Sequence, residues 1–156
     1  MKRWILVGGL SLAAWAADPT AAAAQQGGVG VRAGLSGDPD QFFFGGHGES
    51  GPIIERLTFR PNLEVGVGQD RTLVAINFEF AYRLSPGTSS RRPWVVYLGG
   101  GPAAVIASDS RRDGTHFGDG LNVLIGVRRP RALFVELKAG LGDSPALKAT
   151  VGCTFK

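Results

Sequence analysis

The chain has 156 residues, of which 24 are glycine, and a formal net charge of +4. This length suits one domain and is too short for two of ordinary size. The positive charge is small and scattered along the chain, so it predicts no binding to nucleic acid. A single cysteine, Cys153, excludes an intramolecular disulfide and argues against a cysteine-based metal site.

The first 24 residues have the pattern of a secretory signal peptide. Two basic residues near the start precede an apolar run, Trp4 to Ala17, and small residues occupy 21–24. This run is shorter than the roughly 20 residues that a membrane-spanning helix needs. We therefore predict cleavage near Ala24, which leaves a mature domain of residues 25–156 with a net charge of about +3.

The mature chain alternates apolar and polar side chains in segments that are separated by turn-forming residues. The clearest segment is Leu147–Phe155, which keeps a period of two over nine residues. Such alternation indicates a strand with one apolar and one polar face. The eight segments of this kind are 29–36, 41–47, 56–67, 74–83, 94–106, 121–128, 133–141 and 147–155. None has a helical period, so we predict an all-β fold, an antiparallel up-and-down barrel of eight strands.

Three places depart from this simple pattern. Pro61 removes a backbone donor, which predicts a bulge or locally weak pairing. The run 99–102, three glycines and a proline, blurs the face assignment of the fifth strand and is expected to bend it. Residues 107–120 are polar, and we expect them to form the longest connection between strands.

The two faces of the predicted strands differ in a way that bears on the environment of the barrel. Apolar residues fill one face almost to the strand ends, where aromatic side chains such as Tyr82, Trp94 and Phe155 occur. Glycine, threonine and a few charges of both signs occupy the other face, which suits a cramped interior. We therefore predict that the apolar face contacts lipid, as in membrane barrels. The alternative is a secreted lipocalin-like barrel with an apolar ligand inside.

The signal peptide, the eight alternating segments, the short turns and the near-terminal Phe155 resemble the small outer-membrane barrels typified by OmpX and the OmpA transmembrane domain. The resemblance covers Val29 to Phe155 and lies in the pattern more than in any motif. It implies an eight-stranded transmembrane barrel in the outer membrane, in contact with outer-membrane lipids. It also implies recognition of the closing strand by the barrel-assembly machinery. In that family the aromatic is usually the last residue, whereas Lys156 follows it here, and Cys153 stands where a second aromatic is common.

The predicted register directs seven charged side chains into the barrel: Arg32, Arg60, Glu64, Glu79, Glu136, Lys138 and Lys148. Their charges nearly balance, and an eight-stranded barrel is only wide enough for side chains to fill. We expect these groups to meet one another and Asn77, Thr150 and Thr154 across the lumen. The predicted function is a structural or surface-interaction barrel with a filled, non-conducting lumen and without cofactor or metal; the sequence indicates no small-molecule ligand.

A lipid-modifying outer-membrane enzyme is a second alternative. Ser108, Ser110 and His116, with Asp113 or Asp119, include the residue types of a nucleophile, a base and an orienting acid. Residues of this kind are also common in solvated loops, which is the interpretation we prefer. We therefore predict that the protein is not an enzyme.

An N-terminus in the periplasm would fix the side on which each connection lies. The outward connections would be 37–40, 68–71, 107–119 and 142–145, and the periplasmic ones 48–52, 85–93 and 129–131. Six arginines would gather at the periplasmic end: Arg83, Arg91, Arg92, Arg128, Arg129 and Arg131. We interpret them either as solvated turn charges or as contacts for anionic lipid phosphates.

Overall fold

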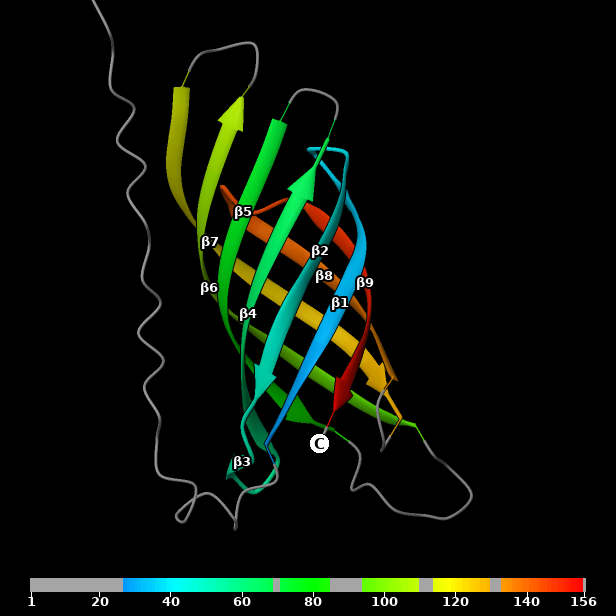
Figure 1. Ribbon diagram of the computed structural model, residues 1–156. Coiled ribbons are helices and arrows are strands. Elements are labelled where there is room, and N and C mark those ends of the chain that lie inside the picture. Colours follow the sequence, from blue (N-terminus) through cyan, green and yellow to red (C-terminus); the bar gives the residue numbers. More distant parts are fainter. Residues whose placement is uncertain (1–26, 69–70, 85–93, 110–113, 130–132, 156) are drawn as a thin grey trace, which may run out of the picture.

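The computed structural model describes residues 27–68, 71–84, 94–109, 114–129 and 133–155, which form one antiparallel β-sheet (Figure 1). Its strands are β1 (Gly28–Gly37), β2 (Gln41–Glu49), β3 (Pro52–Ile54), β4 (Leu57–Val67), β5 (Arg71–Arg83), β6 (Val95–Asp109), β7 (Gly114–Arg128), β8 (Leu133–Gly142) and β9 (Leu147–Phe155). Within these ranges no helix is long and apolar enough to cross a membrane. The predicted signal peptide lies outside the described residues.

The sheet closes on itself because the first strand pairs with the last. In this ladder Val29 lies opposite Phe155, and Gly37 lies opposite Leu147. β1 also pairs with β2, β2 pairs with β4, and each later strand pairs with the next as far as β9. The short β3 pairs with the start of β4, so the barrel wall consists of eight strands. The predicted eight-stranded antiparallel barrel is confirmed.

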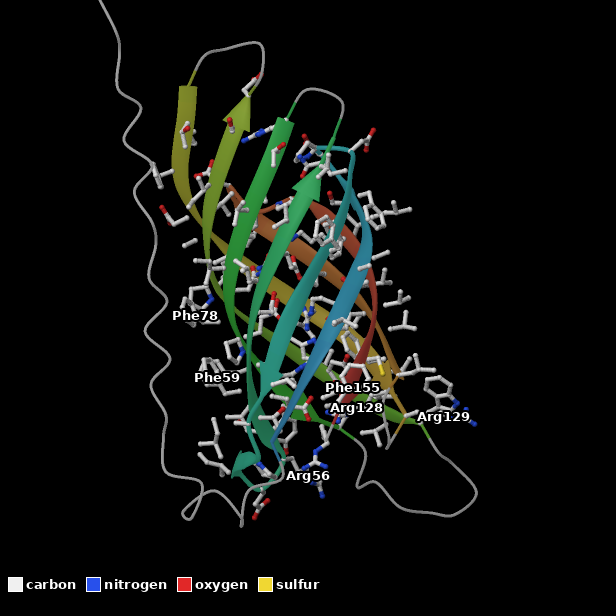
Figure 2. The ribbon with its side chains drawn as sticks, viewed as in Figure 1. Arg56, Phe59, Phe78, Arg128, Arg129 and Phe155 are labelled. Atoms are coloured by element: carbon white, nitrogen blue, oxygen red, sulfur yellow. The ribbon has the colours of Figure 1, made fainter. Side chains whose placement is uncertain are left out.

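Alternation along each strand sorts the side chains into an outer and an inner set. Along β8, Val135 and Leu137 are exposed on the outside, whereas Glu136 is buried in the lumen. Phe59 and Phe78 point away from the barrel and stack on each other, with 6.5 Å between ring centroids (Figure 2). The apolar face therefore lies outside and the polar face inside, as the sequence predicts for a barrel of the membrane type.

Two connections differ from the sequence prediction. Most of 107–120 is strand, because β6 continues to Asp109, β7 begins at Gly114, and Ser108 pairs with Thr115. The side chains from Gly114 to Phe117 are all exposed, so this end of the hairpin has no buried face and shows no alternation of polarity. The three-residue β3 is not predicted either, because a segment of that length cannot show a period.

The proline and glycine positions weaken pairing locally without changing the register. The β6–β7 ladder runs through 99–102 with an unbroken register. The β5–β6 ladder has a gap at Phe78 and Glu79, opposite Pro102, which has no backbone N–H to donate. Pro61 stays in the β4–β5 ladder, whereas the pairing of β4 with β2 ends at Asn62. Of the two outcomes predicted at Pro61, the structure therefore shows the weak pairing and no bulge. Burial alternates along β6 except at residues 99–101, which are all half-buried.

Two inward-facing glycines make room for aromatic rings of neighbouring strands. A Cβ at Gly152 would lie 2.2 Å from a ring carbon of Phe134, and one at Gly126 would lie 2.4 Å from the ring of Tyr97. Both rings are buried, and each lies directly opposite its glycine in the ladder. Glycine at these positions lets an aromatic ring from the adjacent strand fold across the narrow lumen.

Replacing Gly152 with alanine should therefore destabilise the barrel by about 1–3 kcal/mol, the usual cost of an added group in a packed core. Gly46→Ala is the matched control, since a Cβ there comes no closer than 3.6 Å to the Gly30 carbonyl oxygen. The measurement is the free energy of unfolding from a urea titration followed by circular dichroism. Equal stability of the two variants would contradict the close packing of the Phe134 ring against Gly152.

Candidate functional site

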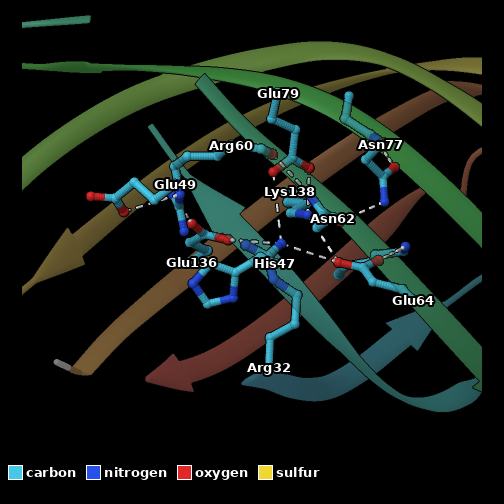
Figure 3. Close-up of polar contacts among 12 residues, drawn as sticks. Arg32, His47, Glu49, Arg60, Asn62, Glu64, Asn77, Glu79, Glu136 and Lys138 are labelled. Atoms are coloured by element: carbon cyan, nitrogen blue, oxygen red, sulfur yellow. Dashed lines mark hydrogen bonds and ion pairs between the residues drawn. The ribbon is translucent and has the colours of Figure 1, made fainter. Parts of the chain in front are cut away.

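Seven charged side chains from β1, β4, β5, β8 and β9 meet in the lumen (Figure 3). They are Arg32, Arg60, Glu64, Glu79, Glu136, Lys138 and Lys148. Each occupies an inward position of its strand, and each is at most 3% exposed. Charges buried to this degree are costly unless they pair with one another, so their partners determine whether the barrel is stable.

Glu64 contacts three cations. Its Oε1 lies 3.2 Å from Arg32 Nη1 and 3.2 Å from Lys138 Nζ. Its Oε2 accepts a hydrogen bond from Lys148 Nζ at 2.6 Å. The carboxylate stands on β4, whereas its three partners stand on β1, β8 and β9. Glu64 therefore connects one wall of the barrel to the opposite wall.

Glu79 and Glu136 complete the network. Lys138 Nζ donates a hydrogen bond to Glu79 Oε1 at 2.5 Å, and Arg60 Nη1 donates one to Glu136 Oε1 at 2.5 Å. Arg32 Nη1 lies 3.7 Å from the second oxygen of each of these carboxylates. Arg32 therefore stands among three carboxylates, and each of the seven charged groups has at least one partner of opposite sign.

Three of the buried cations also lie over aromatic rings. The guanidinium carbons of Arg32 and Arg60 lie 5.4 and 5.0 Å from the ring centroid of Phe134. Lys148 Nζ lies 5.1 Å from the ring centroid of Phe43. The negative face of an aromatic ring attracts a cation within this distance. The rings thus add favourable contacts where water is excluded.

Further residues join the network near the end of the barrel that holds the chain termini. Arg128 Nη1 donates to both carboxylate oxygens of Glu49, at 2.8 and 2.9 Å. Arg60 Nε lies 3.7 Å from Glu49 Oε2, and the Tyr97 hydroxyl donates to Glu136 Oε1 at 2.7 Å. The sequence predicts Glu49 in a turn, but β2 continues to this residue. The alternation from His47 to Glu49 is the signal that could have found it.

The polar residues expected around the charges have other partners. Asn122 Nδ2 donates to Asn77 Oδ1 at 2.8 Å, and Asn77 Nδ2 donates to Asn62 Oδ1 at 2.7 Å. Thr154 Oγ1 lies 2.9 Å from His47 Nε2. The Thr150 hydroxyl has no hydrogen-bond partner in the described part of the chain. Asn77, Thr150 and Thr154 therefore fill space beside the ionic network and do not join it.

The residues considered for hydrolytic chemistry are not brought together. Ser108 and His116 occupy positions of opposite parity in the β6–β7 ladder, so their side chains point to opposite faces of the hairpin. Ser110 and Asp113 lie outside the described residues. Among the residues that are described, no group of three or more His, Cys, Asp or Glu is placed to hold a metal ion.

Removing one member of the network should cost far more than removing a carboxylate at the rim. We expect Glu136→Ala to lower the free energy of unfolding by about 3–5 kcal/mol, because Arg60 loses its closest partner while it stays buried. Glu55→Ala is the control, since Glu55 is exposed next to β3. Urea titrations of both variants provide the comparison, and a small loss for Glu136→Ala would mean that water replaces the carboxylate.

Comparisons with known proteins identify the fold of this chain but not its function. No protein-family model matches the chain, and no curated protein matches it. The Neisserial surface protein A (NspA) structure matches with a TM-score of 0.60 and 16% identity, over 83% of this chain and 95% of that chain. The N-terminal β-barrel domain of Pseudomonas aeruginosa OprF matches with a TM-score of 0.65 and 12% identity, over the same shares. The chain therefore has the fold of the small eight-stranded outer-membrane β-barrels.

Proposed function

We propose that this chain is an integral outer-membrane β-barrel with a structural or surface-interaction role, and that its own side chains close its lumen. The observation that supports this most strongly is the inversion of polarity between the two faces of the wall. Leucine, valine, isoleucine and phenylalanine are exposed all around the outside, whereas arginine, lysine and glutamate fill the inside. A continuous exposed apolar surface of this kind requires a cover, and membrane lipid provides one.

The proposed partners follow from this placement. Outer-membrane lipids would contact the outward face of every strand. The barrel-assembly machinery would contact β9, the strand that closes the sheet, whose outward Phe155 is 57% exposed. The strands β1, β4, β6 and β8 finish at one end of the barrel, and the described chain begins and ends at the other (Figure 1). We propose that the end with the termini faces the periplasm.

The structure gives little support to the alternative functions. A lipocalin-like carrier needs an apolar cavity inside its barrel, whereas the ionic network fills this lumen. Two hollows of about 800 and 450 Å³ lie against outward residues such as Leu35, Phe42 and Val151. An enzyme would need reactive groups in mutual contact, and Ser108 and His116 face apart. A non-enzymatic role therefore agrees best with the geometry.

A lysine on the outward face distinguishes a membrane barrel from a soluble one. At Leu137 we expect lysine to destabilise the protein in lipid vesicles by about 2–4 kcal/mol, with a cost below about 1 kcal/mol at Leu147 near the strand end. Both positions are more than half exposed, so in a soluble barrel both changes would be close to neutral. Unfolding free energies measured in vesicles test this, and equal small effects at the two positions would contradict the membrane proposal.

Cell fractionation provides the control for that experiment. The wild-type protein should remain in the membrane fraction until detergent is added, and boiled and unboiled samples should migrate differently on a gel. A protein that is soluble without detergent and binds a fatty acid would support the lipocalin-like alternative instead.

The filled lumen also predicts little ion conduction. Arg32, Arg60 and Lys138 stand in the middle of the lumen with their carboxylate partners, so no continuous water path is expected. Planar-bilayer recording should show no steady large conductance from the wild-type protein. A large current that Glu136→Ala leaves unchanged would show that the lumen is open and that the packing argument is wrong.

A further inference from the structure

The two ends of the barrel carry opposite charge. At the end where β1, β4, β6 and β8 finish lie five described aspartates, Asp38, Asp40, Asp109, Asp119 and Asp143, and one described arginine, Arg71. At the end with the termini lie four described arginines, Arg56, Arg83, Arg128 and Arg129 (three of them in Figure 2), and two glutamates, Glu49 and Glu55. Other charged residues of the barrel domain lie outside the described residues: Asp70, Arg91, Arg92, Arg111, Arg112, Asp113, Arg131 and Lys156. Among the described residues the charge separation is strong, even though the net charge of the whole chain is small.

Three of these arginines lack the carboxylate partners that the lumen provides. Every interior cation pairs with a glutamate, and Arg128 pairs with Glu49. No carboxylate of the described chain forms an ion pair with Arg56, Arg83 or Arg129. We call these three residues the arginine arc. Arg129 is exposed, whereas Arg56 and Arg83 are half-buried, and Arg83 has the inward parity of its strand with an unpartnered Nε. These charges stand at the rim, where an anion from outside the protein can approach them.

The arginine arc follows the part of the rim that runs from β4 to β8. The Arg83 N–H donates to the Arg56 carbonyl at 3.0 Å, which joins the end of β5 to the turn before β4. Arg129 follows the end of β7, and its N–H donates to the Leu133 carbonyl at the start of β8 at 2.8 Å. The strands β4 to β8 are consecutive in the sheet. The arc therefore spans neighbouring strands and leaves the β9–β1–β2 side of the rim without it.

An apolar surface adjoins the arc. The guanidinium carbon of Arg129 lies 5.7 Å from the ring of Trp94, which is 47% exposed. Tyr82 and Leu84, beside Arg83, are exposed on the outside as well. Tryptophan and tyrosine favour the boundary between hydrocarbon and headgroups, and a guanidinium beside them lies at the depth of lipid phosphates. A ligand that fits both surfaces has an anionic headgroup and acyl chains.

We propose that the arginine arc binds anionic phospholipid in the leaflet at the terminal end of the barrel. This inference rests on the proposed membrane location. The arc is too long for one phosphate to reach all three arginines, because β4 and β8 lie on opposite walls of the barrel. One headgroup phosphate would lie against Arg129 beside Trp94, and another against Arg56 and Arg83, since arginine forms bidentate hydrogen bonds to phosphate oxygens readily. The acyl chains would lie along the outward side chains of β5, β6 and β7. The acidic residues at the other end of the barrel would repel the same lipid, so the preference belongs to one end.

Trp94 provides the reporter for a test. It is the only tryptophan of residues 25–156, because Trp4 and Trp15 lie in the predicted signal peptide. The mature protein is reconstituted into vesicles that contain bromine-labelled phosphatidylglycerol or bromine-labelled phosphatidylcholine. Quenching of Trp94 by each lipid gives their relative affinities at the arc. We expect the anionic lipid to be preferred about fivefold, the effect of roughly one basic group at a charged membrane surface.

Substitutions then locate the source of the preference. Arg129→Gln should reduce it, the triple change at Arg56, Arg83 and Arg129 should bring the affinity ratio to about 1, and Arg129→Lys should retain most of it. Arg71→Gln, at the opposite rim, is the matched control and should leave the ratio unchanged. Equal quenching by both lipids in the wild type would overturn the inference, as would an equal loss in Arg71→Gln.

Two further outcomes separate the inference from its premises. Absence of quenching by either lipid would show that the barrel is not in the bilayer, which would contradict the proposed function itself. Adding millimolar inorganic phosphate should leave the quenching ratio unchanged. If free phosphate abolishes the preference, the arc is a site for a soluble anion and the assignment to lipid is wrong.

Discussion

The narrowness of the lumen is the constraint on which the rest of this structure depends. Eight strands enclose just enough space for side chains, so every charge that points inward must find its partner within the barrel. Glu64 satisfies this constraint by accepting from three strands at once. Gly126 and Gly152 leave the space that the rings of Tyr97 and Phe134 occupy in the lumen. Both the paired charges and the inward glycines thus follow from the small width of the lumen.

The same constraint explains why the two faces of the wall have such different compositions. In the proposed membrane location, outward positions require only an apolar side chain that contacts lipid, and leucine, valine, isoleucine and phenylalanine all occur there. Inward positions are specified individually, because each must match a partner across the lumen in charge and in size. Arg32, for example, stands among three carboxylates that come from β4, β5 and β8.

Alternation in the sequence predicts most of the fold because each strand has one apolar face on the outside of the barrel and one polar face in the lumen. Leu147–Phe155 shows this most clearly, since its parity alone directs Lys148 inward and Phe155 outward. The same signal fails from Gly114 to Phe117, where the hairpin has no buried face and exposure no longer alternates. It is weak at the end of β2, because glycines at 45, 46 and 48 leave only His47 and Glu49 to show the alternation.

Sequence parity gives the direction of an inward side chain but does not give its partner. Lys148 on β9 contacts Glu64 on β4, and these two strands are not neighbours in the sheet. Their contact depends on how far each side chain reaches across a closed barrel, which no local pattern encodes. Tyr97 shows the same limit, since its hydrogen bond to Glu136 joins β6 to β8.

The position of Lys148 on the closing strand has a consequence for the order of folding events. Lys148 is the last interior cation along the chain, and its partner Glu64 precedes it by 84 residues. The two groups meet only when β9 pairs with β1, so the lumen charges are incompletely neutralised in any partly closed sheet. Such a sheet would have to carry unpaired charge into the hydrocarbon, which is costly. We therefore expect strand closure, charge neutralisation and entry into the bilayer to occur as one cooperative step, dominated by contacts that are distant in sequence.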